Sequence, residues 1–89
     1  MLTQLTPSIE DYLQTIYRLD RGQGVRSVDV SKQLNVSKPS VNRALKTLVD
    51  LGFVTQEPYG DIFLTVEGRK TALELNKKYA ILRGFLVHM

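Results

Sequence analysis

The sequence contains no cysteine, and its single histidine, His88, is the penultimate residue. Without thiols the chain forms neither a disulfide framework nor a thiolate metal site. Gly22 and Gly24 lack the preceding strand and the third glycine of a phosphate-binding loop. No carboxylates are paired on a shared face, so no group of residues suggests catalysis. We therefore expect a protein that is not an enzyme.

Long apolar runs are also absent. No stretch approaches the ~18 apolar residues of a membrane span, and the opening residues lack the basic and apolar parts of a signal peptide. We therefore expect a cytoplasmic protein without a membrane partner. Its 89 residues, 43% of them hydrophobic, are enough for one domain with a modest core.

The net charge of +3 is small but unevenly distributed. Residues 18–46 carry seven basic and two acidic side chains, whereas residues 47–68 carry four acidic side chains and no basic one. A basic segment of this kind suits a polyanion such as nucleic acid. The alternative is a solvated surface that happens to be basic.

Helical periodicity and capping residues divide the first half of the sequence into three helices. Thr6 is the expected N-cap of the first helix, which ends near residues 21–24. Ser27 is the expected N-cap of a second, short helix, and Ser37 is that of a third, which follows a tight connection. Gly52 ends the third helix at a position that favours a left-handed backbone.

The pattern then changes to two short β-rich stretches, residues 53–57 and 62–65, separated by a turn. They predict a β-hairpin, and Thr65 is the expected N-cap of a last helix that runs to the end of the chain. We therefore predict a mainly α fold with a small β-hairpin, a winged helix-turn-helix with a long C-terminal helix. The winged helix-turn-helix domain spans residues 1–66, and the C-terminal helix spans residues 67–89.

The third helix has two different faces. Placed on a wheel of about 100° per residue, the apolar residues from Val41 to Leu48 face inward. The opposite side presents Pro39, Asn42, Arg43 and Lys46. In a major groove, arginine pairs with guanine and asparagine with adenine through two hydrogen bonds. The short helix and tight turn before it match a helix-turn-helix, so we predict that this face reads DNA bases. The alternative is a set of solvated charges.

Other residues are expected to contact the DNA backbone without specifying sequence. The hydroxyl groups of Ser37 and Ser40, with the free N–H groups at the start of the third helix, predict a phosphate site. The alternative is that Ser37 is only an N-cap. Arg26 and Lys32, at the entry and on the exposed face of the second helix, are further candidates. The predicted DNA-binding residues are Arg26, Ser27, Lys32, Ser37, Lys38, Pro39, Ser40, Asn42, Arg43, Lys46 and Tyr59.

The tip of the predicted hairpin carries no basic residue. A wing that enters a minor groove usually offers arginine or lysine, whereas this one offers Tyr59, Gly60 and Asp61. We expect the hairpin either to lie along the DNA backbone through Tyr59 or to make no contact with DNA.

Five segments of the chain resemble the N-terminal half of the metal-dependent repressors. They are TPSIEDYL (6–13), IYRL (16–19), LNVSKPSV (34–41), LGFV (51–54) and LTVEGR (64–69). The resemblance is to the iron-dependent diphtheria toxin repressor family and its manganese transport regulator branch. It implies a homodimeric repressor of metal-uptake genes that binds palindromic operators when loaded with Fe(II) or Mn(II).

The sequence departs from this family where the metal binds. In the manganese branch the first helix supplies an aspartate and, three residues later, a glutamate, and the long helix supplies a histidine. Asp11 matches the aspartate, but Gln14 and Tyr79 stand at the other two positions. A neutral amide is a poor substitute for a carboxylate. We therefore predict no metal cofactor, and we expect Asp11 to stabilise the start of the first helix instead.

Apolar residues in the last helix recur at heptad spacing. The predicted dimerisation seam contains Leu75, Tyr79, Leu82 and Leu86. A helix of about 24 residues is about 36 Å long and extends beyond so small a domain, so we expect its second half to pair with a second copy of the chain. The alternative is a fragment of a longer protein that ends in an exposed stub.

These observations predict a sequence-specific regulator that binds double-stranded DNA, most simply a repressor acting as a homodimer on a palindromic operator. Two alternatives remain open. One is a winged helix that binds another protein, which would usually carry aromatic or aliphatic anchors on the third helix. The other is the DNA-binding half of a longer metal-dependent repressor.

Overall fold

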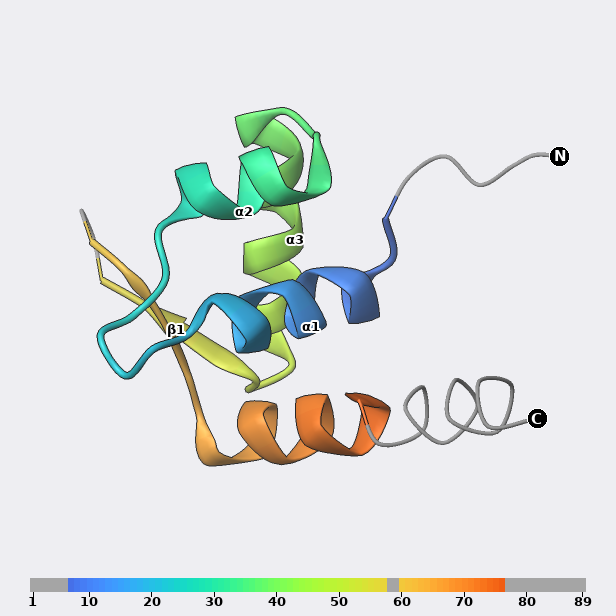
Figure 1. Cartoon of the computed structure of the whole chain (residues 1–89), viewed down its shortest axis with the longest axis vertical. Helices are drawn as coiled ribbons and strands as arrows, with labels where there is room; N and C mark the ends of the chain where they lie inside the picture. Colours follow the sequence, from blue (N-terminus) through green and yellow to red (C-terminus); the bar gives the residue numbers. More distant parts are fainter. Residues whose placement is uncertain (1–6, 58–59, 77–89) are drawn as a thin grey trace, which may run out of the picture.

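The computed structural model describes residues 7–57 and 60–76 of the chain (Figure 1). Three helices, a two-stranded antiparallel sheet and a further helical segment follow one another, as the sequence predicted. The elements are α1 (Ile9–Leu19), α2 (Ser27–Leu34), α3 (Lys38–Asp50), β1 (Val54–Gln56), β2 (Ile62–Leu64) and the helical segment 66–76. None of the helices in these ranges is long and apolar enough to cross a membrane. The predicted continuation of the last helix to residue 89 lies outside the described residues.

Helix α1 begins at Ile9, with Ser8 as its N-cap. The Ser8 hydroxyl accepts a hydrogen bond from the Asp11 N–H at 3.2 Å, and the Asp11 carboxylate accepts one from the Ser8 N–H at 2.9 Å. This reciprocal capping box explains why the helix starts there. The prediction that Thr6 caps the helix is therefore wrong, and Thr6 itself lies outside the described residues. The prediction that Asp11 serves the start of the helix is confirmed.

Helices α2 and α3 form the helix-turn-helix. The prediction that Ser27 caps α2 is wrong: the N-cap residue is Arg26, and Ser27 is the first helical residue. No side chain forms a capping hydrogen bond at this helix start. Asn35 ends α2 in the left-handed conformation with φ of 56°. The Ser31 hydroxyl then donates to the Val36 carbonyl at 2.6 Å, which ties the turn to the helix that precedes it.

Helix α3 is capped as the sequence predicted. The Ser37 hydroxyl accepts a hydrogen bond from the Ser40 N–H at 3.3 Å. Gly52 follows the helix with φ of 82°, which confirms the expected left-handed position. Four α3 side chains are buried against α1 and α2: Val41, Ala44, Leu45 and Leu48.

The hairpin is shorter than predicted, with three residues in each strand. Thr55 pairs with Phe63 at the centre of the register. A contact that the sequence did not predict extends this sheet: Val25, just before α2, exchanges two backbone hydrogen bonds with Ile62 at 2.8 and 2.7 Å. Both side chains are buried, so this bridge fixes the hairpin to the start of α2.

The helical segment 66–76 is fastened to the rest of the domain at three points. The Thr65 hydroxyl accepts from the Gly68 N–H at 3.0 Å, which confirms Thr65 as the cap, and donates to the Gly52 carbonyl at 2.6 Å. A Cβ on Gly68 would lie 1.8 Å from the Phe53 carbonyl oxygen, so only glycine allows this approach. One turn further, Ala72 is fully buried in the core.

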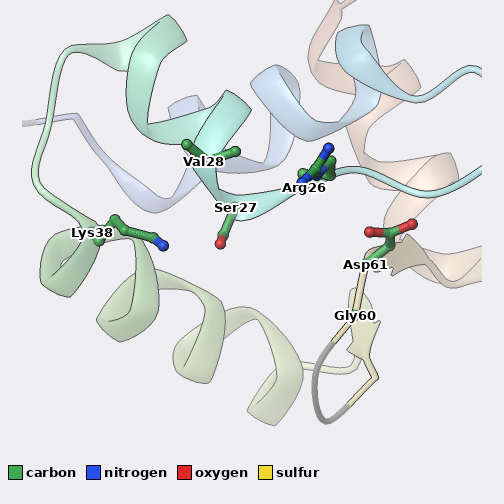
Figure 2. Close-up of a pocket in the computed structure, with 6 residues that line it drawn as sticks. All are labelled: Arg26, Ser27, Val28, Lys38, Gly60 and Asp61. Carbon is green, nitrogen blue, oxygen red and sulfur yellow. The ribbon is translucent and has the colours of Figure 1, made fainter.

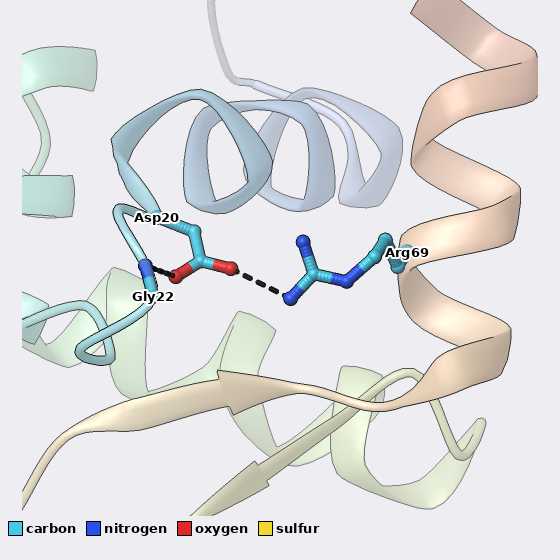
Figure 3. Close-up of polar contacts among 3 residues, drawn as sticks. All are labelled: Asp20, Gly22 and Arg69. Atoms are coloured by element: carbon cyan, nitrogen blue, oxygen red, sulfur yellow. Dashed lines mark hydrogen bonds and ion pairs between the residues drawn. The ribbon is translucent and has the colours of Figure 1, made fainter.

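An ion pair adds a contact between this segment and the end of α1 (Figure 3). Arg69 donates to the Asp20 carboxylate at 2.9 Å, and the other oxygen of Asp20 accepts from the Gly22 N–H, also at 2.9 Å. The Asp20 side chain is only 8% exposed, which places its charge in a largely desolvated position between the two elements. The start of the predicted C-terminal helix is thus part of the same core as the helix-turn-helix.

Candidate nucleic-acid interface

The outward face of α3 presents the residues that the sequence assigned to base contacts. Asn42, Arg43 and Lys46 are all exposed, as is Pro39 at the start of the helix. The opposite face of α3 is fixed in the core, so the exposed face has one defined orientation. The predicted division of α3 into a buried and a solvent-facing side is therefore present, while base contact by these residues stays a prediction.

The start of α3 presents hydroxyl groups and one ammonium group. The hydroxyls of Ser37 and Ser40 lie 3.0 Å apart and Lys38 is exposed between them in the sequence. The N–H of Ser40 already bonds to Ser37, and Pro39 has none. The predicted phosphate site therefore offers fewer free backbone N–H groups than the sequence suggested, and its donors are mainly the two hydroxyls and the lysine.

A cleft with a volume of about 650 Å³ lies between the starts of α2 and α3 and the hairpin (Figure 2). Its lining residues are Arg26, Ser27, Val28, Lys38, Gly60 and Asp61. In Figure 2, Lys38 projects from α3 toward Ser27 on α2, and Asp61 lies at the hairpin. The cleft thus brings together three predicted DNA-binding residues: Arg26, Ser27 and Lys38.

Two predicted residues lie elsewhere. Lys32 is exposed on α2 but does not line this cleft. Tyr59 lies outside the described residues. The sequence pattern did not indicate Val28 and Asp61 as site residues, because their place in the cleft depends on the bridge between Val25 and Ile62, which joins residues far apart in the sequence.

A smaller groove of about 270 Å³ borders the other side of α3. The start of α1 forms one wall with Pro7, Ile9 and Tyr12. The other wall is formed by Ser40, Arg43, Ala44 and Thr47 of α3. Helix α1 therefore flanks Arg43.

Within the part of the chain that the structure describes, the basic side chains of this surface form no ion pair with a carboxylate. Across residues 7–57 and 60–76, the one ion pair is that between Arg69 and Asp20, on a different part of the molecule. Arg26, Lys38 and Arg43 form none there. Their charges are therefore available to an external anion, and phosphates of nucleic acid are the polyanion that such a surface suits.

No three histidine, cysteine, aspartate or glutamate side chains cluster among the described residues. The Asp11 carboxylate is engaged in the capping box. The Gln14 amide nitrogen is buried without a hydrogen-bond partner among the described residues, and a neutral amide is a poor substitute for a carboxylate as a metal ligand. Tyr79, the third position considered in the sequence, lies outside the described residues.

Comparison with known proteins independently supports the interpretation of this surface as a DNA-binding interface. The sequence profile of the iron dependent repressor N-terminal DNA binding domain matches residues 4–62. The Escherichia coli transcriptional regulator MntR is 39% identical over 80 residues, which cover 89% of this chain and 52% of that protein. An uncharacterised helix-turn-helix-type transcriptional regulator of Methanocaldococcus jannaschii is 34% identical over 85 residues, covering 93% of this chain and 68% of that protein. The chain thus spans about half the length of the MntR protein it matches.

Solved structures show the same fold at lower sequence identity. MepR, a transcription regulator of the Staphylococcus aureus multidrug efflux pump MepA, aligns with a TM-score of 0.69 and 21% identity over 90% of this chain and 60% of its own. MepR bound to ethidium bromide aligns with a TM-score of 0.73 and 20% identity over 94% of this chain and 64% of its own. These likenesses support the winged helix fold.

Proposed function

Because the chain belongs to the iron dependent repressor family and carries that family's N-terminal DNA-binding domain, we propose that it is a transcriptional repressor whose α3 reads bases in the major groove. One observation carries this proposal. The outward face of α3 presents Asn42, Arg43 and Lys46 without a protein partner in the described ranges, whereas the inward face fixes the helix in the core.

In this proposal, residues around α3 hold the DNA backbone. Ser37, Ser40 and Lys38 at the start of α3 and Arg26 and Ser27 across the cleft supply donors to phosphates, which fixes the position of α3 in the groove. Lys32 on α2 adds a more distant phosphate contact, and Tyr59 is proposed to touch the backbone from the hairpin.

We also propose that the regulator acts as a homodimer on a palindromic operator, in the cytoplasm and without catalytic activity. A domain of this size covers roughly half of such an operator, and two copies would stand one helical turn, about 34–36 Å, apart. The proposed dimerisation residues are Leu75, Tyr79, Leu82 and Leu86. Leu75 packs partly against the core, and the other three lie outside the described residues.

We propose that DNA binding needs no divalent metal. The reason is the set of available ligands: one oxygen of Asp11 already accepts a hydrogen bond in the capping box, and Gln14 offers a neutral amide. If Mn(II) bound the folded chain and not the unfolded chain, it would raise the melting temperature by mass action. We expect micromolar Mn(II) to leave the melting temperature and the DNA affinity unchanged, and a clear rise at near-stoichiometric metal would contradict this.

The experiment that tests the function is selection of bound duplexes from a random pool by the purified chain. We expect enrichment of one motif with two-fold symmetry, to the same extent with and without Mn(II). Enrichment of a motif without two-fold symmetry would support sequence-specific DNA binding and contradict the homodimer. If no motif were enriched at low salt, the repressor proposal would fail and the protein-binding alternative would be favoured.

A further inference from the structure

The wall of the cleft formed by the hairpin carries a charge opposite to that of the other walls. Arg26 and Lys38 line the cleft on the helix-turn-helix, and Asp61 lines it on the hairpin (Figure 2). The function proposed above uses the two basic residues and leaves the carboxylate without a role. A carboxylate beside two phosphate-binding cations is unfavourable to a phosphate that enters the same cleft.

The backbone around Asp61 is held in place. Its carbonyl accepts from the Glu57 N–H at 3.2 Å, and the next residue, Ile62, is fully buried and bridged to Val25. On the other side, a Cβ built on Gly24 would lie 2.7 Å from the Asp61 Cβ, and Gly24 has φ of +89°. Asp61 therefore lies close to the Gly24 backbone, on a stretch of the hairpin whose backbone is hydrogen-bonded on both sides.

The Asp61 carboxylate forms no ion pair and no side-chain hydrogen bond with the residues that the structure describes. Its charge therefore acts on whatever else occupies the cleft. It repels a phosphate, and it attracts the same Arg26 guanidinium that a phosphate would use. Both effects weaken binding of the DNA backbone, and neither involves the base-reading face of α3.

We propose that Asp61 sets the affinity of the cleft for DNA by repulsion. It lowers the affinity of the cleft for DNA backbone, so that the base contacts of α3 carry a larger share of binding. Because phosphate contacts carry no sequence information, this repulsion weakens random and selected duplexes alike. This inference rests on the proposed DNA-binding function.

The test is the affinity of Asp61→Asn for a fluorescent random-sequence duplex and for the duplex enriched by selection. Asparagine keeps the shape and the Cβ and removes the charge. At low salt we expect binding of the random duplex to tighten about three- to tenfold, the order of one charge–charge interaction through water. Binding of the selected duplex should tighten by a similar factor. The effect should shrink as salt screens it.

Glu57→Gln is the matched control, because it removes the same charge from an exposed residue of the same hairpin that does not line the cleft. We expect it to change both affinities by less than half as much as Asp61→Asn. Melting temperatures of both variants should equal that of the unmodified chain, and Asp61→Ala provides a second neutral variant.

Three outcomes would overturn the role of Asp61: unchanged affinity for random DNA in Asp61→Asn, a gain that does not shrink as salt is raised, or an equal effect of Glu57→Gln. Each of these requires that the unmodified chain binds DNA. Failure of the proposed function is recognised separately, because the unmodified chain would then show no preference for any duplex.

Discussion

Helix α3 and the helical segment 66–76 begin with the same kind of cap, but the two caps lie in different surroundings. Each starts at a hydroxyl N-cap, Ser37 or Thr65, that accepts from the N–H three residues later. The Thr65 hydroxyl also donates to the Gly52 carbonyl, so its segment is fastened to the core. The Ser37 hydroxyl instead lies beside that of Ser40 at the exposed start of α3.

The outward faces of the two helices also differ. On α3 the exposed side presents asparagine, arginine and lysine. On the segment 66–76 the exposed side presents Val66, which is 83% exposed, and Leu73, which is 45% exposed, beside a groove of about 360 Å³, together with acidic and basic side chains. A cationic face suits DNA better than one that mixes apolar, acidic and basic side chains. The same capping chemistry thus starts one helix that is available to a ligand and one that supports the core.

The largest expected effect concerns the helical segment 66–76. Gly68→Ala places a Cβ against the Phe53 carbonyl oxygen, where a gap of 1.8 Å leaves no room. The helix must move off the core, and we expect a loss of roughly 3 kcal/mol or more in the free energy of unfolding, measured by urea denaturation. Lys70→Ala, on the exposed side of the same helix, should change it by less than about 0.5 kcal/mol. Equal stability of the two variants would contradict the close approach.

The next largest effect concerns α3. Arg43→Ala removes the proposed guanine contact, and we expect binding of the selected duplex to weaken by about 1–3 kcal/mol with relaxed preference at one base position. The free energy of unfolding should stay within about 0.5 kcal/mol, because Arg43 is exposed. Fluorescence anisotropy with the selected duplex and with single-base variants measures both. An equal loss of affinity for all duplexes would show that Arg43 does not read a base.

A comparison of the two caps separates their roles. Thr65→Val loses an accepted and a donated hydrogen bond, and we expect about 1–2 kcal/mol of destabilisation. Ser37→Ala loses the cap of α3 and the exposed hydrogen bond between the Ser37 and Ser40 hydroxyls, which together cost about 1 kcal/mol. Only the serine variant should also weaken DNA binding. Affinities are measured well below both melting temperatures, so that the lower stability of the variants does not affect them. A loss of affinity confined to Thr65→Val would reverse the assignment.

The smallest expected effect is that of Lys32→Ala. A single exposed phosphate contact on α2 affects all sequences alike, so the affinity for random and selected duplexes should fall by the same small factor. The slope of log affinity against log salt should decrease by roughly one unit. Titrations at several salt concentrations measure it, and a change in sequence preference would contradict a backbone role.

Local signals predicted much of the fold. The caps at Ser37 and Thr65 and the left-handed Gly52 depend on neighbouring residues, and the structure confirms all three. The start of α1 was misplaced, although its signal was present: Ser8 is followed by Asp11 at the spacing of a capping box. The proline that follows Thr6 indicated an earlier start, and the two reciprocal hydrogen bonds outweigh it.

Contacts between distant residues could not be predicted in this way. The bridge between Val25 and Ile62 and the packing of Asp61 on Gly24 join segments more than thirty positions apart. They decide which residues face Arg26 across the cleft. The basic residues of the site were therefore identified from the sequence, but their arrangement around one cleft, with a carboxylate on its far wall, required the fold.

The central claim is that the outward face of α3, and not that of the segment 66–76, meets DNA. Titration of the isotope-labelled chain with the selected duplex, followed by backbone amide chemical shifts, tests it directly. The account predicts the largest shifts in residues 37–47 and 26–28, with residues 66–76 close to their free positions. Large shifts centred on Val66 and Leu73, with α3 unchanged, would contradict it.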